Sequence, residues 1–261
     1  MIVLGYFLSI LIGVSLGLMG GGGSILTVPL LVYFFKVDPL LAASYSLIIV
    51  GFTSLIGITP YIKDRNIDFK SVLSFGIPSI IAVFLTKYFL VPLIPLKIAT
   101  ASFEIKTDFI VLLFFSMILL ISAFSMIRKK NIETKALSFS SFKLIIQGII
   151  IGFITGVIGI GGGFLIIPVL VKVCQISMKK AVGTSLLIIV LNAIIGLIAG
   201  KEYSNFNVEL LISILFFSLL GMILGVRLSR KIDGKKLTVL FGWFTLVIGV
   251  TILGIELVKL R

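Results

Sequence analysis

The chain has 261 residues, of which 59% are hydrophobic and only 13% are charged. About a quarter of the residues of a soluble globular domain are charged, so this composition excludes a soluble fold. The formal net charge is +13, but the basic residues stand in short loops between apolar segments. There they orient a chain in a lipid bilayer and do not indicate nucleic-acid binding. With no histidine and one cysteine, Cys174, the chain lacks a disulfide framework, and we expect neither a metal site nor a cofactor.

Long apolar stretches without charge are typical of membrane-spanning helices, because about 20 apolar residues cover the hydrocarbon core of a bilayer. A membrane β-barrel would need short segments of alternating polarity, which the sequence lacks. The sequence therefore predicts an all-α integral membrane protein. The stretches without Asp, Glu, Lys or Arg are 1–35, 39–62, 71–86, 109–127, 144–171, 181–200, 210–226 and 237–255.

An internal repeat divides the chain into two halves. Residues 13–32 align without gaps on residues 152–171, at an offset of 139, and nine of the twenty positions are identical. Most identities are glycine or proline, so generic apolar composition does not explain them. The same offset pairs 42–57 with 181–196. The predicted single transmembrane domain, 1–261, consists of repeat one at 1–127, a charged linker at 128–143 and repeat two at 144–261.

Each half begins with a glycine-interrupted segment and continues with three ordinary spans. If the interrupted segments crossed the membrane once, Lys and Arg would divide almost evenly between the two sides. If they enter and return, 16 stand on one side and 7 on the other, which obeys the positive-inside rule. The sequence therefore predicts two inverted repeats, each a re-entrant segment plus three transmembrane helices, with both termini outside and the linker in the cytoplasm. The expected spans are 40–60, 71–96, 108–127, 180–200, 208–228 and 237–257.

Two glycine-rich runs, 20–24 and 159–163, interrupt apolar sequence at equivalent places. Consecutive glycines break a helix, since each costs about 1 kcal/mol relative to alanine. The helix that restarts presents unpaired N–H groups and a partial positive charge, which suit an anion. Close helix packing is the alternative role for glycine, and we favour it for the pairs Gly13/Gly17 and Gly152/Gly156 earlier in each half. The candidate substrate-binding residues of the runs are Gly22, Gly23, Ser24, Gly161, Gly162 and Gly163.

Polar side chains follow each glycine run on the next predicted span. Each span carries two polar residues seven positions apart, which places them on one helix face. They are Ser46 and Thr53 in the first half and Ser185 and Asn192 in the second. Hydroxyls and an amide on one face can donate to an anion. Serine and threonine in membrane helices also bond back to their own carbonyls, which is an equal alternative, whereas an amide cannot satisfy all its groups in that way. The candidate substrate-binding residues on these spans are Ser46, Thr53, Thr184, Ser185 and Asn192.

The pattern GxxxGxxGxGGGxxxxP at 152–168 and the segment KKAVGTSLLIIVLNAIIG at 179–196, with their first-half copies, resemble the TauE/SafE sulfite exporter family of membrane permeases. The resemblance covers nearly the whole chain, including GITPYIKDRNID at 57–68 and LGVRLSRKID at 224–233. It implies transport of sulfite, sulfonates or related sulfur-containing anions. The first half departs from the motif, with Ser24 in place of its last glycine.

These features predict a secondary transporter in the cytoplasmic membrane that exports a small anion. The runner-up is a membrane-embedded enzyme, although a nucleophile with a base or paired carboxylates is not visible in the membrane segments. A structural subunit would leave the repeated glycine breaks without a role. Because the apolar stretches contain no Asp, Glu or His, we expect uncoupled export driven by the membrane potential. Lys87 is expected to snorkel to the interface, and the sequence does not decide between a monomer and a homodimer.

Overall fold

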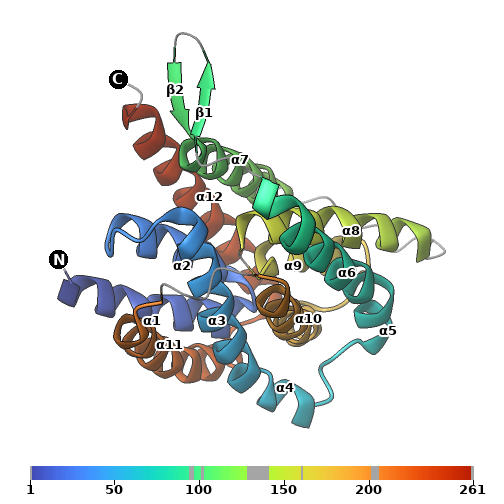
Figure 1. The fold of residues 1–261 in the computed structure, drawn as a ribbon. Helices are drawn as coiled ribbons and strands as arrows, with labels where there is room; N and C mark the ends of the chain where they lie inside the picture. The colour runs from blue at the N-terminus through green and yellow to red at the C-terminus, as the bar shows by residue number, and fades with distance from the viewer. Residues whose placement is uncertain are drawn as a thin grey trace.

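The computed structural model describes residues 2–93, 97–100, 103–127, 141–159, 161–200 and 206–259 (Figure 1). Most of the predicted linker, 128–140, lies outside these residues, as does Ile160 of the second glycine run. The helices of the first half are α1 (Ile2–Met19), α2 (Gly22–Tyr33), α3 (Pro39–Gly57), α4 (Thr59–Lys63), α5 (Phe69–Ser71), α6 (Ile77–Leu85) and α7 (Thr107–Ile127). Those of the second half are α8 (Ser141–Ile158), α9 (Gly163–Lys172), α10 (Met178–Ala199), α11 (Val208–Ser229) and α12 (Gly234–Lys259).

Six helical segments of the described chain are long and apolar enough to cross a membrane, and they correspond to the six predicted spans. The second of them is irregular. Two π-helical turns, Val72–Gly76 and Thr86–Leu90, flank α6, and the 3-10 turn Val91–Leu93 ends the segment. The glycine-interrupted segments form shorter helices on either side of each break, as predicted.

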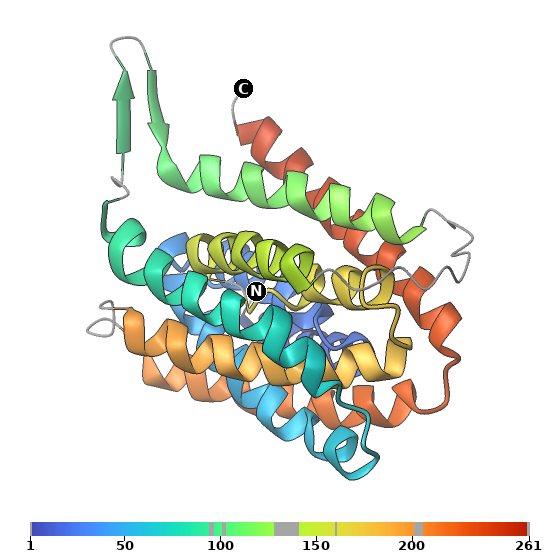
Figure 2. The same ribbon diagram turned by 90° about the vertical axis from the view of Figure 1, so that its right-hand side faces the viewer.

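A two-stranded hairpin departs from the all-helical prediction. β1 (Lys97–Thr100) pairs antiparallel with β2 (Phe103–Lys106) in the connection between the second and third spans. Figure 2 shows the hairpin projecting beyond the helices. Two lysines stand opposite each other at one end of the pairing, Lys97 and Lys106. These charges and the unpaired strand edges are compatible with an aqueous location, since backbone groups facing lipid must be satisfied internally.

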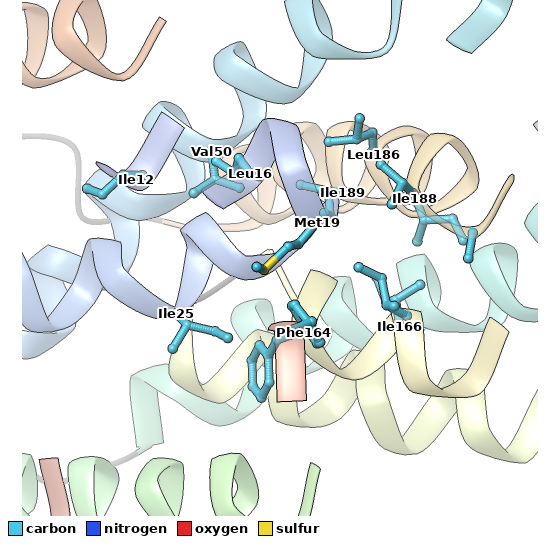
Figure 3. Packing of buried hydrophobic residues seen from close by; sticks show 14 of the residues in the cluster. Ile12, Leu16, Met19, Ile25, Val50, Phe164, Ile166, Leu186, Ile188 and Ile189 are labelled. Carbon is cyan, nitrogen blue, oxygen red and sulfur yellow. The ribbon is translucent and has the colours of Figure 1, made fainter. Parts of the chain in front are cut away.

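Large apolar side chains cover the outer surface as well as the interior. Phe69, Ile121 and Trp243 are each more than half exposed, which suits contact with lipid and would be costly in water. Inside, Met19 of α1 lies near Phe164 of α9 and Ile189 of α10, as Figure 3 shows. The core is therefore shared by the two halves. The protein is a multi-pass membrane protein.

The first glycine-interrupted segment reverses direction at its break. Gly23, near the start of α2, packs against the Ile12 carbonyl and the Leu16 side chain of α1. Beyond the other end of α2, the ring of Phe35 comes within 2.6 Å of the Cβ position of Gly5. Thus α2 runs antiparallel to α1, and Phe35 lies beside the N-terminal part of α1. This geometry agrees with the prediction of a re-entrant segment.

Contacts between the halves occur twice in equivalent form. A Cβ atom at Gly13 would meet the Ser218 carbonyl at 1.8 Å, and one at Gly152 would meet the Ser79 carbonyl at 2.3 Å. The offset of 139 relates Gly13 to Gly152 and Ser79 to Ser218. Accordingly α1 packs closely on α11, and α8 packs closely on α6 (Figure 1). The packing role predicted for these glycines is therefore confirmed.

Equivalent helices of the two halves cross each other in opposite directions. Gly51 of α3 contacts Ala193 of α10, and Leu47 of α3 contacts Gly196 of α10. The residue numbers of α3 therefore decrease in the direction in which those of α10 increase, so the two helices are antiparallel. The equivalent helices α7 and α12 also pack on each other (Figure 2). Antiparallel equivalent helices are what a two-fold axis in the membrane plane would produce. The inverted topology itself stays a prediction, which these contacts support.

Candidate substrate site at the two helix breaks

Both helices that precede a glycine run end in a left-handed glycine. Gly20, directly after α1, has a φ of 64°, and Gly159, directly after α8, has a φ of 71°. These two positions are equivalent by the repeat. An L side chain is disfavoured in this conformation, which is the reason that glycine stands there. The glycine runs therefore end one helix and change the direction of the chain before the next helix begins.

The two breaks meet at the buried centre of the protein. A Cβ atom at Gly163 would stand 2.5 Å from the Cα atom of Gly21, and one at Gly21 would stand 2.3 Å from the Gly163 carbonyl carbon. Each left-handed glycine packs against a residue of the other half, Gly20 against Val182 and Gly159 against Ala43. Val182 and Ala43 are themselves equivalent by the repeat. The first turns of α2 and α9 are thus brought together.

Each break is followed by a helix N-terminus without a side-chain cap. Gly21 precedes α2 and Gly162 precedes α9, and neither can offer a capping side chain. Gly162 has a φ of 72°, and its carbonyl accepts from the amides of Leu165 and Ile166. The first amides of a helix have no partner within that helix and carry a partial positive charge. Two such ends in a buried region can bind a small anion.

Several predicted residues lie at the junction of the breaks. The Ser24 hydroxyl donates to the Gly21 carbonyl at 2.7 Å, and the Ser185 hydroxyl donates to the Gly20 carbonyl at 2.9 Å. Gly161 packs against Ile189 of α10 and Val50 of α3. Gly22 is the first residue of α2, whereas Gly23 fits against α1.

Other predicted residues are engaged elsewhere. The Thr184 hydroxyl donates to the Lys180 carbonyl and accepts from the amide of Asp68, in the loop before α5. Thr53 bonds back to the carbonyls of Ile49 and Val50. Both hydroxyls are thus engaged with groups other than the backbone of the two breaks, and their place in the site stays a prediction.

Asn192 joins α10 to α6 within the membrane region. Its side chain is fully buried, and its amide nitrogen donates to the Ser79 hydroxyl at 3.2 Å. Its amide oxygen has no hydrogen-bond partner among the described residues. An amide on this helix cannot satisfy all its groups locally, as the sequence indicated.

The comparisons with known proteins decide the family. The family model described as sulfite exporter TauE/SafE matches residues 6–252. The chain belongs to the TauE/SafE family. The chain is also 29% identical to the probable membrane transporter protein MJ0441 of Methanocaldococcus jannaschii and 27% identical to the probable membrane transporter protein YunE of Bacillus subtilis. These matches cover 94% and 93% of both chains, respectively. No solved structure matches the chain significantly.

Membership in the TauE/SafE family, together with the six candidate spans, identifies the protein as a membrane transporter. This supports the transport prediction over an enzyme or a structural subunit. The family match spans both glycine runs and all the candidate residues.

Two charged residues of this transporter are buried, contrary to expectation. Glu256 lies in the last turns of α12, where only 2% of it is exposed, and the Tyr33 hydroxyl donates to its carboxylate at 2.7 Å. Glu256 directly follows the uncharged stretch 237–255, so its burial is not apparent from the sequence. Lys87 is 4% exposed, so the snorkelling prediction is wrong. It lies in a π-helical turn of the second span, which changes the face that its side chain occupies.

Basic side chains line two clefts at one end of the transporter. Lys179, Arg230 and Tyr61 line a cleft of about 200 Å³. Arg227 and Arg230 line a neighbouring cleft of about 250 Å³ between α3 and α11. Arg230 pairs with Asp64 at 2.8 Å. This is the end that the charge distribution assigns to the cytoplasm.

Proposed function

We propose that this TauE/SafE-family transporter moves sulfite, a sulfonate or a related sulfur-containing anion out of the cytoplasm through a site at the two helix breaks. The observation that carries the proposal is the contact between Gly21 and Gly163, which brings the starts of α2 and α9 together inside the protein. Two helix N-termini at one buried place provide N–H donors and positive partial charge. Discontinuous helices at the interface of two repeats are the usual site-forming elements of inverted-repeat transporters.

The proposed topology has six spans, three in each half, and two re-entrant segments. An odd number of spans in a repeat starts the second repeat on the opposite side of the membrane from the first. The antiparallel crossing of α3 and α10 supports this inversion, as does the division of 16 basic residues against 7.

Export is supported by the basic clefts near Lys179, Arg227 and Arg230. A concentration of positive charge at the proposed cytoplasmic end attracts anions and raises their local concentration. Arg230 and Asp64 are both about half exposed, so their ion pair is screened by solvent and contributes little to stability. Opening it would require little energy.

The test is thermal unfolding of the purified full-length protein in detergent with a panel of anions: sulfite, methanesulfonate, sulfate, phosphate, acetate and chloride. A ligand of the folded state stabilises it by about 2.7 kcal/mol at 100 times its dissociation constant. We expect the sulfur oxyanions to raise the unfolding temperature most. An equal or absent effect of all six anions would contradict the proposal.

A further inference from the structure

The two helix breaks differ in whether their hydroxyl groups are satisfied. At the first-half break, Ser24 and Ser185 donate to the Gly21 and Gly20 carbonyls. The repeat equivalent of Ser185 is Ser46, and a matching bond from Ser46 to Gly159 would be expected. The buried Ser46 hydroxyl has no hydrogen-bond partner in the described part of the chain.

A second free hydroxyl points at the start of α9. Thr155, in the last turn of α8, is 1% exposed, and its hydroxyl oxygen also has no partner within the described residues. That oxygen lies 2.3 Å from the Cβ position of Gly162, the residue that precedes α9. It is therefore directed at the uncapped N-terminus of this ten-residue helix.

The lack of a bond at Thr155 is unusual for this protein. Buried helical threonines elsewhere bond back to the preceding turn, Thr27 to the Gly23 carbonyl and Thr245 to the Phe241 carbonyl. A buried hydroxyl without a partner is destabilising. In the first half, the equivalent of Thr155 is Leu16, whose side chain fills the space beside Gly23. The hydroxyl is thus a feature of the second-half break only.

Ser46 lies on the face of α3 that covers the same break. Ala43 contacts the Cβ position of Gly159 at 2.1 Å, and Val50 contacts that of Gly161 at 3.3 Å. Ser46 follows Ala43 by three residues and precedes Val50 by four, so all three share one helix face. Ser46 therefore stands between two residues that touch the run 159–163.

We propose that the charged oxyanion group of the substrate binds at the second-half break alone, held by the hydroxyls of Thr155 and Ser46 and by the first amides of α9. This inference rests on the proposed function and makes the site asymmetric. The first-half break, with its own hydroxyls satisfied and Leu16 in place of the threonine, contributes the positive partial charge of α2 but no direct hydrogen bond. Donors from three separate elements suit a group with three oxygens, such as sulfite or a sulfonate, better than chloride.

The experiment compares substitutions that remove a free hydroxyl with matched substitutions that remove a bonded one. Thr155→Val and Ser46→Ala are tested against Thr27→Val and Ser9→Ala, since the Thr27 and Ser9 hydroxyls bond to their own helices. Sulfite affinity is measured by calorimetry on the purified full-length protein, and unfolding temperature is measured without ligand.

We expect Thr155→Val and Ser46→Ala each to weaken sulfite binding by about tenfold to a hundredfold, as loss of a hydrogen bond to a charged group does. Without ligand they should be at least as stable as the wild type. The controls should show the reverse, lower stability with affinity within about twofold. Thr155→Ser keeps the hydroxyl and should keep the affinity.

Two outcomes overturn different conclusions. If the wild type binds sulfite and both Thr155→Val and Ser46→Ala bind it equally well, the asymmetric site is wrong while the proposed function stands. If the wild type binds no sulfur oxyanion, the proposed function fails and the inference fails with it. Should Thr155→Val not fold, Ser46→Ala decides the question by itself.

Discussion

The Cα atom of Gly21 lies 2.5 Å from the point where a Cβ atom on Gly163 would stand. No side chain fits there, so the backbones of the two helix breaks touch directly. Glycine is required at this contact for space, because a single methyl group on either residue would separate the starts of α2 and α9. The two short helices can approach one buried place only under this condition.

Gly163→Ala is therefore expected to destabilise the protein by about 1–3 kcal/mol, because the added methyl group overpacks the junction against Gly21 and Ile189. The control is Gly254→Ala in α12, whose Cβ position has no neighbour within 4 Å. That control should be neutral or stabilising by up to about 1 kcal/mol, because alanine favours a helix. Thermal unfolding in detergent measures both. Equal stability of the two variants would show that the junction is not tightly packed.

The inverted topology predicts opposite labelling of two equivalent positions. Lys70 and Glu209 are both exposed and are related by the offset of 139. In a Cys174→Ser background, Lys70→Cys should react with an impermeant maleimide only from the cytoplasm, and Glu209→Cys only from outside. Labelling of both from the same side would contradict the inversion.

The sequence predicted the repeat, the six spans and the re-entrant segments because each depends on composition and periodicity. It could not predict the β1–β2 hairpin, since a ten-residue segment carries too little periodicity to separate a strand from a loop. Nor could the apolar pattern show that Glu256 is buried, because burial of a carboxylate depends on a partner, Tyr33, that is 223 residues away.

The site was predictable only in part for a similar reason. Glycine runs mark a helix break in any context, so Gly20 and Gly159 were found without a structure. Whether a hydroxyl is free depends on its neighbours in space. Thr53 and Ser46 lie on the same predicted span, yet Thr53 bonds to its own helix and Ser46 does not. Thr155 was missed because it precedes the run and resembles an ordinary helical threonine.

Cys174, between α9 and α10, is expected to react slowly with thiol reagents. Burial raises the pKa of its thiol; a hydrogen bond with Ser71 lowers that pKa in part, and the Asp68 carboxylate raises it. Since the thiolate is the reactive form, maleimide labelling at pH 8 should be slower than that of Lys70→Cys. The rate should increase as the pH rises, and Ser71→Ala should reduce it further.

Mass spectrometry of timed samples measures this labelling, and denaturant provides the control, because unfolding removes the burial. Rapid reaction of Cys174 in the folded protein at pH 8 would show that the connection between α9 and α10 is open to solvent.

The energetics of the proposed export depend on the role of Glu256. Uncoupled export was expected from a lack of acidic residues in the membrane, and the buried Glu256 removes that premise. Its position still argues against a role at the substrate site. Glu256 accepts from Tyr33, the last residue of α2, whereas the helix break precedes the first residue, Gly22. The eleven-residue step between them spans roughly 16 Å at 1.5 Å per residue.

We therefore expect the membrane potential to drive export and Glu256 to serve stability. An interior-negative potential supplies about 2.3 kcal/mol per charge per 100 mV, or about 4.6 kcal/mol for a dianion, which supports an outward gradient of roughly three orders of magnitude. In proteoliposomes loaded with sulfite, efflux should accelerate when valinomycin sets the interior negative, and a pH gradient at zero potential should not drive it. Tyr33→Phe, which leaves the carboxylate without this donor, should lower stability by about 1.5–3 kcal/mol but retain potential-driven efflux. Uphill efflux driven by a pH gradient in the wild type and lost in Glu256→Gln would assign proton coupling to Glu256 instead.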